Sequence, residues 1–165
     1  MKRSLQIMTG LLLLNVAGYA APGQPFELSP DWEQKILQIA PVRAPAKPKA
    51  DRKVLVFSLN TGFKHWCIPH TSAMVQILGE KSGGYTTVQS NDIEEFLPEN
   101  VSQYDAIVLN NNCPQGSSRD IFLDTLVHKI DEFGAKYKER PLEEREALAL
   151  KLYNSLTSYI AEGGV

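Results

Sequence analysis

An apolar segment followed at once by polar and reactive side chains occupies residues 53–70, KVLVFSLNTGFKHWCIPH. His65 is the candidate general acid or base, because an imidazole titrates near neutral pH. Lys64 stands just before a predicted helix, whose free N–H groups favour anions and polar oxygens. We therefore expect Thr61, Gly62 and Lys64 to bind a substrate beside His65.

A second polar segment, residues 110–115, follows another apolar run. It opens with three asparagines, whose amides offer both donors and acceptors and so suit sugar hydroxyls. The competing interpretation is turn chemistry, since Asn tolerates unusual backbone angles. If the strands before the two segments are neighbours, the two loops face one another across a cleft. Asn110 and Asn111 then join the predicted substrate-binding residues, with Gln115 a weaker candidate.

Metal binding is the alternative use of the first segment. Imidazole and thiolate groups suit zinc, and His65, Cys67 and His70 are the possible ligands. Their spacing matches no recognised zinc motif. In the competing interpretation, His65 hydrogen-bonds the loop, Cys67 packs or is bridged, and His70 lies in the first turn of a helix. We therefore predict no metal or other cofactor, and we expect His128 to be a surface residue on a helix.

The chain has two cysteines, Cys67 and Cys113. Cys113 is a poor nucleophile, because the residue after an elbow nucleophile usually donates its N–H to an oxyanion and Pro114 has none. Each cysteine follows one of the two strands that we expect to be adjacent. We therefore predict that the two lie close together and form a disulfide, which an oxidising compartment permits.

Alternating elements must position these residues. Strands are predicted at 54–59, 85–89 and 106–109, and a helix at 69–81 with Met74, Ile77 and Leu78 facing inward. Glycines at 83 and 84 should end that helix. Ser117 and Asp120 form a capping box before one continuous helix, whose apolar face comprises Phe122, Leu126, Ile130, Phe133 and Tyr137. A last helix starts at Pro141 and places Leu142, Ala149, Leu152, Leu156 and Ile160 on one face.

The resulting fold class is α/β, a flavodoxin-like doubly wound parallel sheet that is truncated before its later strands. The last helix leads into glycines 163 and 164 and then Val165, where another strand would begin. A small helix capped by Ser29, with Trp32, Ile36 and Ile39 on one face, lies before the domain. The domains are therefore residues 21–50, the helix and a proline-rich linker, and residues 51–165, an incomplete α/β domain.

Residues 1–20 are predicted to be a secretory signal peptide. Lys2 and Arg3 precede an apolar run, and Gly18 and Ala20 occupy the small-residue positions of a cleavage site. The alternative is an uncleaved membrane anchor, for which the run is short. Cleavage after Ala20 would deliver the chain to the periplasm or outside the cell. It would also reduce the 17 Lys and Arg residues to 15, against 19 Asp and Glu, a charge balance that excludes nucleic acid and anionic membranes as partners.

The chain resembles the trehalose-utilisation family, usually called ThuA-like, whose fold is related to class I glutamine amidotransferases. The resemblance rests on residues 54–65 (VLVFSLNTGFKH), 104–111 (YDAIVLNN) and 159–164 (YIAEGG), within residues 53–165. The family pattern continues beyond the glycines to a Gly-x-His turn. The resemblance implies a link to carbohydrate metabolism, with keto-sugars among the candidates. Together with the predicted signal peptide, it leads us to expect an exported domain that binds or transforms a carbohydrate-derived small molecule. The alternative is a non-catalytic binding or interaction module within a longer exported protein.

Overall fold

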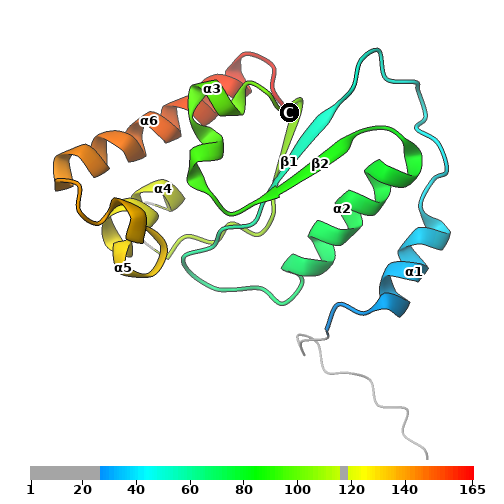
Figure 1. The fold of residues 1–165 in the computed structure, drawn as a ribbon, viewed down its shortest axis with the longest axis horizontal. Coiled ribbons are helices and arrows are strands. Elements are labelled where there is room, and N and C mark those ends of the chain that lie inside the picture. Colours follow the sequence, from blue (N-terminus) through cyan, green and yellow to red (C-terminus); the bar gives the residue numbers. More distant parts are fainter. Residues whose placement is uncertain (1–26, 116–118) are drawn as a thin grey trace, which may run out of the picture.

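The computed structural model describes residues 27–115 and 119–165. It is a mixed α/β structure built on a parallel sheet of three strands in the order β2-β1-β3 (Figure 1). The strands are β1 (Lys53–Phe57), β2 (Thr86–Ser90) and β3 (Ala106–Leu109). β1 is central and its last four residues are buried, as its unbroken apolar sequence predicts. The predicted signal peptide lies outside the described residues.

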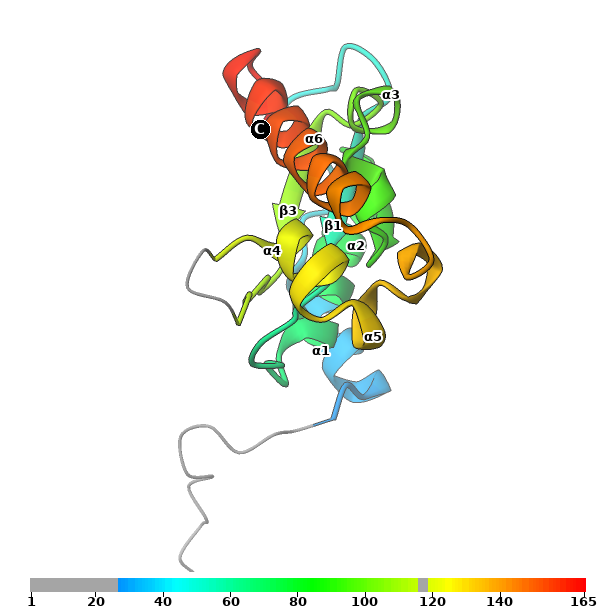
Figure 2. The ribbon, with the colours of Figure 1, turned by 90° about the vertical axis from the view of Figure 1, so that its left-hand side faces the viewer.

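Helices cover both faces of the sheet (Figures 1 and 2). One face packs against α2 (Ile68–Ser82), with α1 (Pro30–Ile39) beyond it. The other face packs against η1 (Ile93–Phe96), α3 (Pro98–Val101) and the helices that follow β3. The main core lies on this second side, where Phe57 and Phe122 both contact Phe96 edge-on, with ring centroids 4.7 and 5.1 Å apart.

α2 corrects a prediction about its inward face. Met74 is exposed, whereas the buried residues of the helix are Ile68, His70, Ser72 and Gly79. Small and polar residues face inward because α2 approaches its neighbours closely: a Cβ on Gly79 would lie 2.5 Å from the Tyr85 ring. The helix ends as predicted, with Gly83 in the left-handed conformation at φ 63°.

α1 docks on α2. Ser29 caps the helix by accepting a hydrogen bond from Trp32 N at 3.3 Å, as predicted. The Trp32 ring then meets the His70 ring edge-on at 5.0 Å, and Lys81 donates a hydrogen bond to the Leu37 carbonyl. Ile39 does not share this interface, because 79% of its surface is exposed. The apolar face of α1 is therefore shorter than the spacing of its apolar residues predicts.

The single helix predicted after residue 120 is wrong. The segment forms α4 (Ile121–Leu123), a π-helical turn η2 (Asp124–His128), α5 (Ile130–Phe133) and a 3₁₀ turn η3 (Ala135–Tyr137). Of the predicted capping box, Ser117 lies outside the described residues, and Asp120 is itself the N-cap, accepting from the backbone N–H groups of residues 122 and 123. The helix widens where the side chain of Asp124 is anchored to two loops, as described below.

α6 (Leu142–Ala161) begins directly after Pro141, as predicted. Ala149 and Leu152 are buried, whereas Leu142 and Ile160 at its ends are exposed. After the helix, the backbone N–H of Ile107 in β3 donates to the carbonyl of Val165 at 2.6 Å. None of the described helices is long and apolar enough to cross a membrane.

Candidate functional site

The loops that follow β1 and β3 lie against each other, as the predicted strand order requires. We call residues 58–67 the β1 loop and residues 110–115 the β3 loop. Gly62 N donates to Cys113 O at 2.7 Å, and Asn112 Nδ2 donates to Leu59 O at 2.6 Å. A Cβ on Gly62 would lie 2.7 Å from the same Cys113 oxygen, so this close approach requires glycine. The two loops therefore form one continuous surface at the carboxyl edge of the sheet.

A buried carboxylate joins both loops to the π-helical turn η2. Asp124 is only 1% exposed, and its Oδ2 accepts hydrogen bonds from Thr61 Oγ1 at 2.7 Å and Gln115 N at 2.8 Å. Its Oδ1 lies 2.9 Å from Nδ1 of His128. A buried carboxylate needs such donors to offset its lost hydration. We call these four residues the Asp124 cluster.

Two of the predicted substrate-binding residues, Thr61 and Asn110, lie inside the fold. The Asn110 side chain is 2% exposed, and its Nδ2 lies within 3.1 Å of Ser58 Oγ, Ile68 O and Ser72 Oγ. Thr61 is 1% exposed and bonds Asp124. In the structure these two side chains hold the loops in place from beneath their surface.

Other predicted residues remain accessible to a ligand. Lys64 is exposed, while Gly62, His65 and Asn111 are partly buried. The His65 ring packs edge-on against the exposed Phe63 ring, with centroids 4.7 Å apart. Asn111 adopts a left-handed backbone conformation at φ 55° and donates from its amide to Asn110 Oδ1 at 3.1 Å. The accessible surface thus combines an amine, an imidazole, an aromatic ring and an amide.

The structure does not contain the predicted disulfide, because Cys67 and Cys113 are both free thiols. The amide of Asn111 lies 3.8 Å from Cys67 Sγ, so this thiol is placed between the two loops. Cys113 contributes its backbone carbonyl to Gly62. The loops are therefore joined by backbone and amide hydrogen bonds where we expected a covalent bridge.

The three candidate zinc ligands do not form a cluster. His70 is buried in α2, where its ring meets those of Trp32 and Trp66 at 5.0 and 5.8 Å, whereas His65 packs on Phe63. Within residues 27–115 and 119–165, no group of three or more His, Cys, Asp or Glu side chains is arranged to hold a metal ion.

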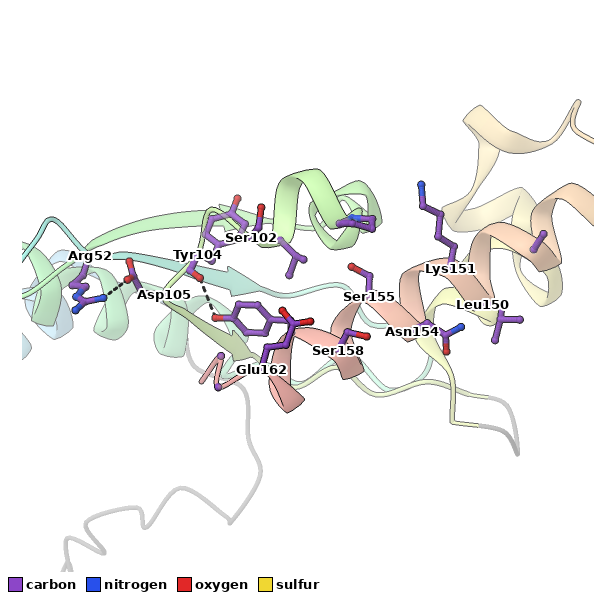
Figure 3. Close-up of a pocket in the computed structure, with 16 residues that line it drawn as sticks. Arg52, Ser102, Tyr104, Asp105, Leu150, Lys151, Asn154, Ser155, Ser158 and Glu162 are labelled. Carbon is purple, nitrogen blue, oxygen red and sulfur yellow. Dashed lines mark hydrogen bonds and ion pairs between the residues drawn. The ribbon is translucent and has the colours of Figure 1, made fainter.

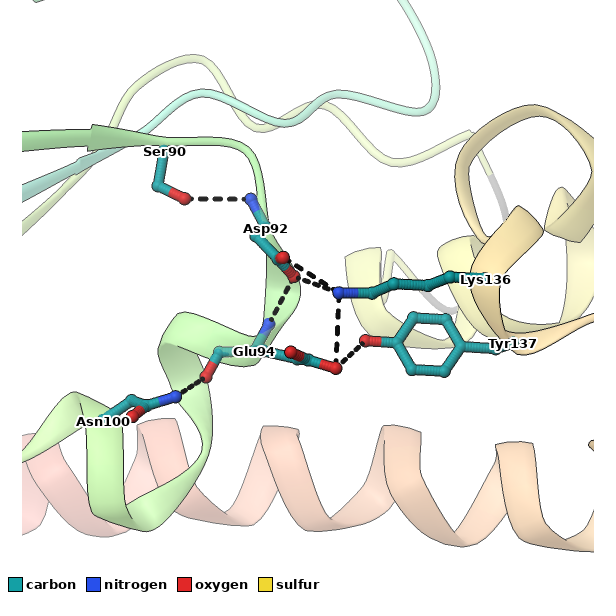
Figure 4. A network of polar contacts seen from close by, with 6 residues as sticks. All are labelled: Ser90, Asp92, Glu94, Asn100, Lys136 and Tyr137. Atoms are coloured by element: carbon teal, nitrogen blue, oxygen red, sulfur yellow. Dashed lines mark hydrogen bonds and ion pairs between the residues drawn. The ribbon is translucent and has the colours of Figure 1, made fainter.

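A second polar network braces the loop after β2 (Figure 4). Lys136 Nζ lies 2.9 Å from Asp92 Oδ2 and 3.3 Å from Glu94 Oε1, and Tyr137 donates to the same Glu94 oxygen at 2.8 Å. Burial and the bond to Glu94 raise the pKa of Tyr137 to about 12. Burial acts to raise the pKa of Asp92, but the Glu94 N–H and Lys136 outweigh it and hold this pKa below its usual value.

A groove lies at the opposite, amino end of the sheet, between α3 and α6 (Figure 3). Its volume is about 970 Å³, and an ion pair between Arg52 and Asp105 lies at one end. The Lys53 N–H and Arg52 lower the pKa of the Asp105 carboxyl. The polar residues of its α6 wall include Asn154, Ser155 and Ser158. No prediction from the sequence pointed to this groove.

Two members of the Asp124 cluster were not recognised from the sequence. His128 is half-exposed, as expected of a surface residue, but its imidazole is held by a buried carboxylate. The Asp-to-His spacing of four residues was the available signal, since such residues are neighbours on a helix. The burial of Asp124 depends on its partners in distant loops and has no local signature.

No protein-family model, curated protein or solved structure matches the chain.

Proposed function

We propose that this chain is an exported domain of the ThuA-like type that binds a carbohydrate-derived small molecule, with keto-sugars among the candidates. The single observation that carries the proposal is the joining of two polar loops, through Gly62 and Asn112, at the carboxyl edge of the sheet. Open parallel sheets bind ligands at this edge. The order β2-β1-β3 is also that of the first three strands of a flavodoxin-like sheet, which supports the finer fold assignment.

The proposed roles differ between accessible and buried side chains of the two loops. Lys64, His65 and Asn111 contact the ligand from the accessible surface, and their donors and acceptors match hydroxyl and carbonyl oxygens. Phe63 offers an exposed ring to the apolar face of a sugar. Thr61 and Asn110 act from below, by holding the loops in register.

The competing proposal is an interaction module without catalysis. The groove between α3 and α6 favours it, because this groove has a volume of about 970 Å³ and lies away from the two loops. The exposed Leu150 and the polar residues beside it would suit a protein segment with mixed character. The two proposals place the ligand at opposite ends of the sheet and can be separated by mutation.

Isothermal titration calorimetry of the purified chain with a panel of sugars and keto-sugars tests the first proposal. Lys64→Ala and His65→Ala should each weaken binding of any sugar that the chain binds. Lys151→Ala, in the groove at the opposite end, is the matched control and should leave that affinity unchanged. The carboxyl-edge site is wrong if Lys151→Ala weakens sugar binding while the two loop variants do not.

A further inference from the structure

We propose that Asp124 and His128 form a proton-transfer dyad at the carboxyl edge, in which His128 is the general base and Asp124 positions it. His128 would take a proton from water or from a hydroxyl group that attacks an ester or another carbonyl carbon. The natural ligand of the dyad, a carbohydrate-derived carbonyl compound, rests on the proposed function. The proton transfer itself is argued from the Asp124 cluster alone.

The contact between the two side chains fixes which ring nitrogen is free. Nδ1 of His128 lies 2.9 Å from Oδ1 of Asp124, and a carboxylate accepts a hydrogen bond, so Nδ1 carries the proton. Nε2 then holds the lone pair of the neutral ring. The His128 side chain is 47% exposed, whereas that of Asp124 is 1% exposed. The imidazole is thus anchored from the interior through Nδ1, while about half of the side chain remains exposed.

Hydrogen bonds hold the anchor in place. Thr61 Oγ1 and Gln115 N donate to Oδ2 of Asp124, whereas His128 lies against Oδ1. The π-helical turn closes through a hydrogen bond from Lys129 N to Asp124 O at 2.7 Å, and this turn carries both members of the dyad. Single π-helical turns within α-helical segments occur frequently at functional sites. Both loops of the proposed ligand site therefore converge on the carboxylate that orients the imidazole.

This arrangement distinguishes His128 from His65, the residue that the sequence favoured. His65 makes a ring contact with Phe63, while the buried carboxylate is paired with His128. A base oriented by a carboxylate is held in one tautomer, and the carboxylate stabilises the imidazolium that forms. His65 keeps its proposed role in binding the ligand.

The step is balanced without a further reactant. An O–H bond of water breaks, its proton passes to Nε2, and the electron pair of that bond forms the new bond from oxygen to the carbonyl carbon, while the π pair of the carbonyl moves onto its own oxygen. With an ester, the tetrahedral intermediate collapses, the bond to the leaving oxygen breaks, and the imidazolium gives its proton to that oxygen. An alcohol or phenol thus departs, and the neutral imidazole is restored.

Hydrolysis of p-nitrophenyl acetate by the purified full chain tests the dyad without knowledge of the natural ligand. A positioned acid or base contributes roughly 100- to 10,000-fold to a reaction. For this unspecific ester we expect the protein-dependent rate to fall about tenfold or more in His128→Gln and in Asp124→Asn. Glu132→Gln is the matched control, since it removes an exposed carboxylate from the adjacent helix, and it should leave the rate unchanged.

Nitrogen-15 NMR of the neutral imidazole tests which ring nitrogen carries the proton, which the dyad requires to be Nδ1. Wild-type His128 should carry its proton on Nδ1. Circular dichroism checks whether Asp124→Asn folds. If Asp124→Asn is unfolded, His128→Gln and the tautomer of the wild-type imidazole decide the proposal. A rate that is unchanged in His128→Gln, a wild-type rate no greater than that of buffer, or a proton on Nε2 would each overturn the dyad. Sugar binding can fail while ester hydrolysis persists, so the two proposals fail separately.

Discussion

Replacing Thr61 by valine tests the buried carboxylate that joins the two loops. The change keeps the shape of the side chain and removes the hydroxyl that donates to Asp124 Oδ2 at 2.7 Å. A hydrogen bond to a charged group contributes about 1.5–3 kcal/mol to stability. Thr61 is 1% exposed, so water cannot easily replace the lost donor. We therefore expect Thr61→Val to lower the free energy of unfolding by about 1.5–3 kcal/mol, which is roughly a 10- to 100-fold change in the folding equilibrium.

Urea denaturation followed by circular dichroism measures this loss, and α6 supplies a matched control. Thr157 is an exposed threonine whose hydroxyl donates to the carbonyls of Tyr153 and Asn154 in its own helix. Thr157→Val should change the free energy of unfolding by about 0.5 kcal/mol or less. If Thr61→Val costs no more than Thr157→Val, then the Thr61 hydroxyl does not support the Asp124 carboxylate, and our reasoning about the cluster is refuted.

Three further predictions concern the loops and their surroundings. Gly62→Ala should destabilise the fold by about 1–3 kcal/mol in the same urea assay, because the new methyl group would collide with the Cys113 carbonyl; an unchanged midpoint would mean that the loops are further apart. Thiol titration of the native protein should detect both Cys67 and Cys113, and detection of none would restore the disulfide. Lys136→Met should lower the melting temperature near neutral pH. Because the pKa of Asp92 is below its usual value in the folded state, this difference should be fully present above about pH 4 and shrink as Asp92 is protonated at lower pH; a difference that grows in acid would contradict the ion pair.

The sequence was sufficient to predict the strands, and for β1 and β3 the reason is that their apolar runs are local. β3 has the predicted bounds, and β1 begins one residue earlier and ends two residues earlier than its apolar run. The early end of β1 reflects the polar β1 loop, which turns toward Cys113 and Asn112 of the β3 loop. Long-range contacts of this kind are set by tertiary structure and leave no periodic signal.

The helical segment after residue 120 shows which features the apolar spacing could not predict. The apolar spacing correctly places Phe122, Leu126 and Tyr137 in the core, although the backbone is not one helix. The anchoring of Asp124 by Thr61 spans 63 residues of sequence, so the widened turn could not be predicted from its neighbours. The same contact turns His128 from an ordinary surface residue into a candidate base.

For the site, the sequence likewise indicated the position of the loops but not the orientation of their side chains. The proximity of the two loops was predicted from the strand order, which the alternation of strands and helices along the sequence indicates. Whether a side chain in those loops faces solvent or the interior depends on its partners. Asn110 is therefore an internal brace, while Lys64, close to it in the predicted site, is exposed.

NMR chemical-shift mapping of the backbone amides and histidine rings, with the same panel of sugars and keto-sugars, tests the central claim most directly. We predict that a bound sugar shifts the backbone amides of residues 58–67 and 110–115, together with the His128 ring. Shifts that cluster instead on α3 and α6 around the groove, or the absence of shifts with every sugar at millimolar concentration, would contradict a carbohydrate site at the carboxyl edge of the sheet.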